Sequence, residues 1–181
     1  MSRVNRRAFL GAAATLLARP TWKPAFAALP RSGPRSLDLH NLHTGEKLAL
    51  DYWVDGRYQA QALASVNHLL RDFRTGEVHM IAPSLLDLLA TLRARLESSG
   101  PFEVISGYRS PATNAMLHGS HEHSGVAVKS LHMQGMAIDI RVPGRPLVNL
   151  RDAALVTHGG GVGYYPSSDF VHVDVGPVRR W

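Results

Sequence analysis

The sequence predicts an α+β fold in which a central antiparallel β-sheet is flanked by helices. Polar and apolar residues alternate in two segments between residues 36 and 54, which is typical of a β-hairpin. Apolar residues recur at helical spacing between residues 59 and 100, and short β-type runs separated by loops follow from residue 102. The 181 residues give room for one domain of ordinary size.

The first 27 residues have the features of an export signal. Arg3, Arg6 and Arg7 form a basic start, residues 9–18 are an apolar run, and Ala25-Phe26-Ala27 offers small residues where a signal peptidase cuts. The run is shorter than the roughly 20 apolar residues that span a bilayer, so no permanent membrane span is expected. Cleavage is expected after residue 27, and a retained anchor is the alternative.

The pair of arginines resembles the twin-arginine signal of proteins that are exported already folded. An ordinary secretory signal that happens to contain paired arginines is the alternative. Removing residues 1–27 lowers the formal net charge from +6 to +1, because this segment holds five basic and no acidic side chains. A nearly neutral domain lacks the basic field that binds phosphate backbones, so no nucleic acid partner is expected. The chain has no cysteine, which leaves only nitrogen and oxygen ligands for a metal.

A flexible lead-in rich in Pro, Gly and Arg is predicted at residues 28–35, followed by a single domain at 36–181. Its first elements are a hairpin with strands at 36–42 and 47–54 and two helices, one at 59–73 and one from Pro83 to a stop at Gly100. Ser110 as a cap and Pro111 at the first helical position indicate a short helix over 112–117. The remaining expected elements are strands at 102–106, 136–142, 161–165 and 170–175, a helix at 147–157, and a surface loop at 118–129.

Two of these strands carry candidate metal ligands. In residues 136–142 the isoleucines face one side, so Asp139 projects from the other, and Gly135 permits a turn that returns His132 to that side. In residues 170–175 the valines define the buried face, and His172 shares the opposite face with Asp174. If the two strands are antiparallel neighbours, His132, Asp139 and His172 converge as the open tetrahedral site of one catalytic Zn²⁺. Taken alone, the His132–Asp139 pair is more typical of surface or hydrogen-bonded residues, and His172 could be a hydrogen-bonded core histidine.

The segment from Ser130 to Asp139 also matches the pattern S-x-H-x-x-G-x-A-x-D. It resembles the LAS zinc peptidases, which comprise lysostaphin, the D-alanyl-D-alanine metallopeptidases and sonic hedgehog, and is most similar to the YcbK-like murein endopeptidases. Three further motifs carry the resemblance: residues 106–111, residues 160–166, and residues 170–174 with Trp181. The resemblance implies a LAS/hedgehog-like fold, His132, Asp139 and His172 as zinc ligands, Arg109 facing the substrate, and an exported protein of the periplasm or cell envelope.

The general base is where the sequence departs from the family. Many members have His two residues before the last ligand or Glu three before it, and here those positions hold Phe170 and Asp169. Asp169 keeps a carboxylate with a shorter side chain, whereas Asp174 shares a face with His172 and could be the base or a partner that orients His172. Both carboxylates could also serve only to order ligands or turns.

The expected function is a zinc-dependent murein endopeptidase that hydrolyses cross-link peptide bonds, either D-Ala–diaminopimelate or diaminopimelate–diaminopimelate. A D-Ala-D-Ala-type carboxypeptidase and a non-catalytic zinc-containing wall-binding module are the alternatives. His121-Glu122-His123 is not a zincin motif, because histidines two residues apart do not share a helix face. No serine lies in a G-x-S-x-G elbow, which argues against a serine hydrolase. The sequence does not indicate the oligomeric state.

Overall fold

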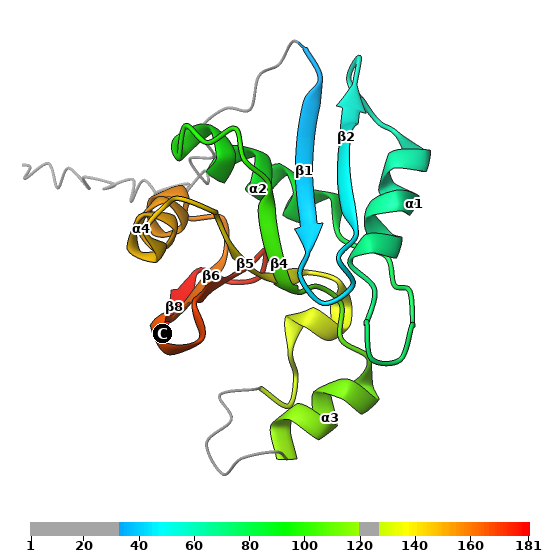
Figure 1. The fold of residues 1–181 in the computed structure, drawn as a ribbon, viewed down its shortest axis with the longest axis vertical. Coiled ribbons are helices and arrows are strands. Elements are labelled where there is room, and N and C mark those ends of the chain that lie inside the picture. Colours follow the sequence, from blue (N-terminus) through cyan, green and yellow to red (C-terminus); the bar gives the residue numbers. More distant parts are fainter. Residues whose placement is uncertain (1–32, 120–126) are drawn as a thin grey trace, which may run out of the picture.

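The computed structural model describes residues 33–119 and 127–181. Its strands form one eight-stranded sheet. The strand order across the sheet is β3-β2-β1-β4-β5-β7-β6-β8. The strands are β1 (Arg35–Asn41), β2 (Lys47–Val54), β3 (Arg57–Tyr58), β4 (Phe102–Ser106), β5 (Ala137–Arg141), β6 (Gly161–Tyr165), β7 (Phe170–Asp174) and β8 (Arg179–Arg180). Figure 1 shows how these strands run between the helices.

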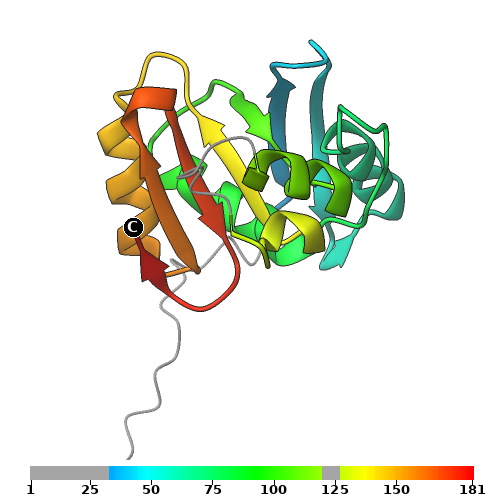
Figure 2. The ribbon, with the colours of Figure 1, turned by 90° about the horizontal axis from the view of Figure 1, so that it is seen from below.

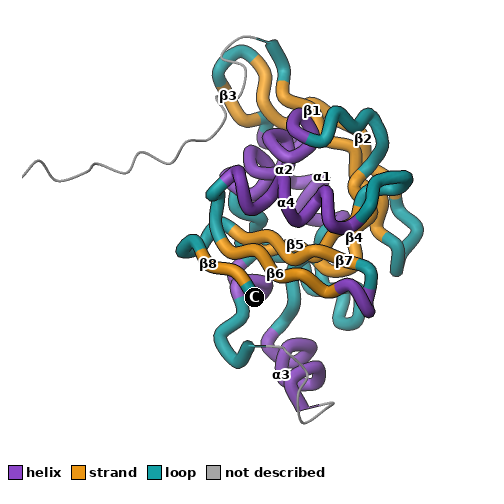
Figure 3. The backbone as a smooth tube through the Cα atoms, turned by 90° about the vertical axis from the view of Figure 1, so that its left-hand side faces the viewer, coloured by secondary structure: helices purple, strands orange, loops and turns teal. Residues whose placement is uncertain are grey.

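The helices lie on both sides of this sheet. They are α1 (Ala60–Leu69), α2 (Pro83–Arg95), α3 (Pro111–Gly119) and α4 (Leu147–Thr157), with two short 3₁₀ helices, η1 (Leu131–Gln134) and η2 (Pro166–Ser168). The sheet curves around α1, α2 and α4, whereas α3 lies on its other side (Figures 2 and 3). The predicted α+β architecture is confirmed.

The hydrophobic core forms where α2 and α4 pack on the concave face of the sheet. Leu85, Leu89 and Leu92, which recur at helical spacing along α2, are completely buried, as are Ile138 and Ile140 on β5. Full burial of one such side chain contributes about 1.5–3 kcal/mol. The isoleucines therefore hold β5 on the core, and the intervening Asp139 is turned to the opposite face.

The sheet is mixed rather than purely antiparallel. Its four site-bearing strands, β4, β5, β7 and β6, pair antiparallel, as predicted. The exceptions are β1 with β4 and β6 with β8, which pair parallel. The long connection through α1 and α2 brings β4 back beside β1 in the same direction, and sequence alternation carries no information on strand direction.

Most boundaries agree with those predicted, but the first two helices are shorter. The helix predicted at 59–73 ends at Leu69; the carbonyl oxygen of Leu70 accepts the N–H of Tyr108, and the N–H of Asp72 donates to the carbonyl oxygen of Glu77. The helix predicted to stop at Gly100 ends at Arg95, and Glu97 adopts a left-handed φ of 48° soon after. In both cases the predicted end lies beyond the last hydrogen bond of helical spacing, which joins Leu70 to Val66 in the first helix and Leu96 to Leu92 in the second.

A buried carboxylate ties the loop after β4 to the rest of the domain. Asp72 accepts hydrogen bonds from the main-chain N–H of Ser110 at 2.9 Å and from its hydroxyl at 2.7 Å. Burial alone would raise the pKa of Asp72, but the hydrogen bonds from Thr113 and Ser110 outweigh it and lower the pKa to about 2. Ser110 Oγ in turn accepts from the N–H of Thr113, which confirms the predicted cap of α3. The backbone next to Arg109 is therefore held firmly in place.

The predicted export signal at 1–27 lies outside the described residues, as do positions 28–32 of the predicted lead-in. The flexible lead-in was predicted to reach residue 35, which is wrong for its last residue because Arg35 is already paired in β1. Among the described residues, no helix is both long enough and apolar enough to cross a bilayer.

Candidate metal centre

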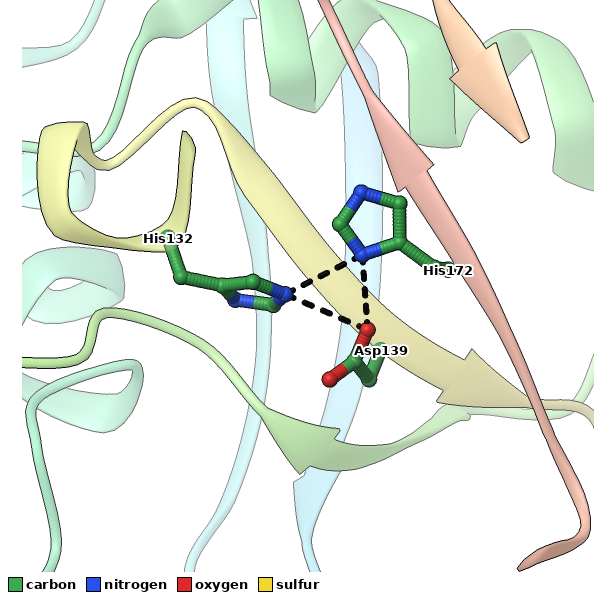
Figure 4. A group of neighbouring side chains, drawn as sticks. All are labelled: His132, Asp139 and His172. Atoms are coloured by element: carbon green, nitrogen blue, oxygen red, sulfur yellow. Dashed lines mark hydrogen bonds and ion pairs between the residues drawn. The ribbon is translucent and has the colours of Figure 1, made fainter. Parts of the chain in front are cut away.

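Three side chains bring one ligand atom each to a common point (Figure 4). His132 Nε2 lies 3.2 Å from Asp139 Oδ1 and 3.1 Å from His172 Nδ1, and His172 Nδ1 lies 2.9 Å from Asp139 Oδ1. All three residues are buried. Four ligands placed tetrahedrally at 2.0–2.1 Å from a zinc ion are about 3.3 Å apart, so the three separations fit one face of such a tetrahedron.

Strand pairing accounts for the position of two of the three. β5 and β7 are antiparallel neighbours, and Asp139 is directly opposite His172 in their register. This is the arrangement on which the predicted convergence depended. Alternation predicted only that Asp139 projects from the face opposite the isoleucines, but the residue is just 2% exposed, so neighbouring side chains enclose it. Its carboxylate is covered by His132 and Arg109.

His132 reaches the cluster from the short helix η1. Ser130 caps η1 by accepting the N–H of His132, and Gly135 ends it with a φ of 65°. A side chain at position 135 would run into the carbonyl oxygen of Met80, so glycine is required there for both its conformation and its size. The other ring nitrogen of His132, Nδ1, donates to the carbonyl oxygen of Gly107 at 2.7 Å.

His172 is oriented from behind by Asp174. His172 Nε2 lies 3.1 Å from Asp174 Oδ2, on the side of the ring away from the cluster. Asp174 is completely buried and also accepts the N–H groups of Gly161 and Gly176 and the guanidinium of Arg179. Burial raises the pKa of Asp174, but the bonds from His172 and the two glycines outweigh it and lower the pKa to about 2.

These outer contacts decide which ring nitrogens carry protons. A carbonyl and a carboxylate only accept, so Gly107 fixes the proton of His132 on Nδ1 and Asp174 fixes that of His172 on Nε2. When both histidines are neutral, the nitrogens that face each other therefore both present lone pairs, next to the Asp139 carboxylate. Three acceptors within 3.2 Å repel one another unless a cation lies among them. The donor set thus fits a metal ion with nitrogen and oxygen ligands.

The charges at the site are strongly coupled. Burial alone would raise the pKa of Asp139, but His132, His172 and Arg109 outweigh it and hold the pKa far below its usual range. Burial lowers the pKa of His132 more than Asp139 raises it. For His172 burial also acts downward, but the bonds to Asp139 and Asp174 outweigh it and raise the pKa. Asp139 is therefore a carboxylate at neutral pH.

Arg109 lies at the edge of the cluster. Its guanidinium pairs with Asp139 Oδ2, the oxygen that is turned away from the histidines, and its Nε donates to Ser106 Oγ at 2.9 Å. Arg109 also lines the pocket in front of the cluster. Its main-chain N–H donates to the carbonyl oxygen of His132, so the loop after β4 and η1 are fastened together.

Asp169, the second candidate for the general base besides Asp174, does not line the pocket with the three candidate ligands. Its carboxylate pairs with Arg141 at 2.7 Å and is 62% exposed. Asp169 and Asp174 are both absent from the pocket lining. His121, Glu122 and His123 lie outside the described residues.

A pocket opens in front of the three ligands. Besides the ligands and Arg109, its described walls comprise Ala127, Lys129, Ser130, Leu131, Tyr165, Ser168, Phe170, Arg179 and Trp181. Among these described lining residues, Asp139 is the one carboxylate, whereas Arg109, Lys129 and Arg179 are cationic. The sequence motifs included Tyr165 and Trp181 but assigned them no role. No sequence feature indicated which of the adjacent Tyr164 and Tyr165 faces the site.

Comparison with known proteins finds similarity over the whole described domain. The family model described as peptidoglycan L,D-endopeptidase MepK matches residues 30–181. The peptidoglycan L,D-endopeptidases MepK of Escherichia coli K12 and Shigella flexneri are each 46% identical to the chain, over 98% of it and 97% of the relative. A Haemophilus influenzae protein named probable peptidoglycan L,D-endopeptidase MepK is 38% identical over 98% and 95%. The family match includes His132, Asp139 and His172, and the chain belongs to the MepK family of peptidases.

Proposed function

We propose that this protein is a zinc-dependent endopeptidase that hydrolyses peptide cross-links of murein. One observation carries the proposal: two imidazole lone pairs and one carboxylate oxygen converge within 3.2 Å at the base of a pocket. Three protein ligands with an open fourth position are characteristic of catalytic rather than structural zinc sites. The relatives named above are described as peptidoglycan L,D-endopeptidases.

The names of the relatives favour one of the two candidate bonds. An L,D bond joins a carbonyl on an L-configured centre to a nitrogen on a D-configured centre. Of the two cross-links, the diaminopimelate–diaminopimelate bond has this configuration, whereas the carbonyl of the D-Ala–diaminopimelate bond belongs to a D-residue. We therefore assign the diaminopimelate–diaminopimelate cross-link as the preferred substrate. Its carboxylates also suit a pocket whose described walls carry Arg109, Lys129 and Arg179.

The protein's own residues prepare the site for amide hydrolysis. Zinc held by His132, Asp139 and His172 would polarise the carbonyl and lower the pKa of a bound water to about 7. Gly107 and Asp174 fix the two imidazoles with their lone pairs turned inward. Arg109 holds the outer oxygen of Asp139 and, because it also lines the pocket, presents its guanidinium to a substrate carboxylate or to the attacked carbonyl.

The contacts of Asp174 favour a role as the partner that orients His172 over a role as the general base. Its two oxygens already accept from His172, Gly161, Gly176 and Arg179, and it has no exposed surface. A base must reach the proton that it removes. Asp169 would have to leave Arg141 to do so. The assignment of the base to either carboxylate stays a prediction.

Purified cross-linked muropeptides test the function directly. The zinc-loaded protein, without residues 1–27, is incubated with diaminopimelate–diaminopimelate dimers, D-Ala–diaminopimelate dimers and pentapeptide monomers, and the products are identified by mass spectrometry. We expect the first dimer to be converted into monomers, and a chelator to stop the reaction. Release of free D-alanine from the monomer alone would establish the carboxypeptidase instead. Binding to murein without any fragment would establish the wall-binding module.

We also propose that the chain is exported to the periplasm, where murein lies, by the signal at residues 1–27. Arg6 and Arg7 are the twin arginines of that signal. Replacing both by Lys is expected to leave the uncleaved precursor in the cytoplasm, as shown by cell fractionation and immunoblotting. Normal export of this variant would exclude the twin-arginine route and leave ordinary secretion.

A further inference from the structure

An aromatic wall stands beside His172 in the pocket. It consists of Tyr165 at the end of β6, Phe170 at the start of β7, and Trp181, and all three line the pocket. Tyr165 stacks on Phe170 with their ring centroids 4.6 Å apart, and the Trp181 ring lies 5.2 Å from the ring of His172. The wall therefore borders the metal centre directly.

The backbone of β6 explains why these rings can approach the site. Gly163 is directly opposite His172 in the β6–β7 register. A Cβ at position 163 would lie 2.7 Å from Cε2 of Trp181 and 2.8 Å from Cε2 of Tyr165, so both rings would have to shift to admit it. Glycine at this position leaves the space that both rings occupy. Trp181 is fixed further by two main-chain hydrogen bonds, with Val162 and Tyr164.

The hydroxyl of Tyr165 has one hydrogen bond whose direction is certain. Trp181 Nε1 lies 2.7 Å from Tyr165 Oη, and an indole N–H can only donate, so the phenol oxygen accepts. The proton of the hydroxyl remains to be donated. Among the residues that the structure describes, no acceptor for it is found, although the side chain lines the pocket that contains the three ligands. The side chain of Tyr165 therefore carries a held hydroxyl with an unused donor, and it lines the same pocket as the three candidate ligands.

We propose that Tyr165 donates a hydrogen bond to the carbonyl oxygen of the scissile amide as negative charge develops on it. This inference rests on the proposed function. Such a donor is effective when it is already held in place and needs no reorganisation during the reaction. The indole of Trp181 and the stacked Phe170 hold Tyr165 in this way. Tyr165 is thus a catalytic residue, and Trp181 positions it.

The variant Tyr165→Phe tests the proposal because it removes one oxygen atom and keeps the ring. We expect kcat on the diaminopimelate–diaminopimelate dimer to fall about 10²- to 10³-fold, as for loss of one oxyanion donor, with little change in KM and unchanged zinc content. Tyr164→Phe is the matched control, since Tyr164 packs against Arg151 in a different surface pocket. Trp181→Phe should lower kcat less, because the hydroxyl remains but loses its fixed direction.

A second measurement separates a catalytic from a structural role. A phosphinate analogue of the cross-link carries the charged tetrahedral oxygens of the transition state, and its affinity should fall in Tyr165→Phe by the same factor as kcat/KM. The affinity for the monomer product should not change. Wild-type kcat in Tyr165→Phe, loss of zinc from it, or equal weakening of analogue and product would each overturn the inference alone. Wild-type protein that cleaves no cross-link would overturn it together with the proposed function.

Discussion

Asp139→Asn is expected to lose the bound metal and the hydrolytic activity together. The substitution keeps the shape of the side chain but replaces a charged ligand with a neutral amide, and it leaves the Arg109 guanidinium without its carboxylate. Loss of an outer partner of a ligand already weakens metal binding about 10- to 100-fold, so loss of a ligand should exceed 100-fold. Activity should fall by about 10³-fold or more, since a catalytic metal contributes several kcal/mol to the transition state.

Metal content measured by plasma mass spectrometry, together with cross-link cleavage, checks this result. We expect about one zinc per chain in the wild type and none in the variant after dialysis. A chelator should lower the melting temperature of the wild type but not that of Asp139→Asn, because only the wild type has a ligand to lose. An Asp139→Asn protein with full zinc content would disprove the ligand assignment.

Asp174→Asn serves as the comparison, because this residue touches His172 rather than the metal position. It should retain zinc at high concentration with a roughly 10- to 100-fold weaker affinity. Turnover at saturating zinc should then be partly recovered. If Asp174 were the base, zinc affinity would be unchanged and turnover would stay about 10²- to 10⁴-fold low at every zinc concentration.

Gly135→Ala is expected to have the largest effect on stability. The left-handed φ of 65° costs an alanine about 1–2 kcal/mol, and displacing the carbonyl of Met80 in a packed region adds about 1–3 kcal/mol. We expect the free energy of unfolding to fall by about 2–5 kcal/mol in urea denaturation. Gly135 also accepts the N–H of Ala82 and donates to His132, so zinc content should fall as well.

Gly144→Ala is the matched control for this prediction. Gly144 has a φ of 73°, but a Cβ there would meet no atom within 4 Å. Its cost should therefore be limited to the conformational component of about 1–2 kcal/mol, with zinc content unchanged. Equal losses of stability in the two variants would show that the contact with Met80 does not constrain η1.

The sequence by itself indicated which residues form the candidate metal centre and which way Asp139 and His172 face. Alternation in residues 136–142 and 170–175 put Asp139 and His172 opposite the apolar side chains, because neighbouring strand residues must point to opposite faces. The same local rules located β4, β6 and α4 to the residue. Gly135 likewise has the role in a turn that was predicted for it, because a positive φ depends on the chain's own geometry.

Only the tertiary structure decided how these local pieces meet. β5 pairs with β7 although α4 and β6 lie between them in the sequence. This pairing depends on packing between segments far apart in the chain. The same holds for Gly107, which fixes the tautomer of His132 from 25 residues away, and for Trp181, which reaches Tyr165 across 16 residues. It was also the structure that placed Asp174 behind His172, since alternation gives the face of a strand but not the partner that a buried carboxylate finds there.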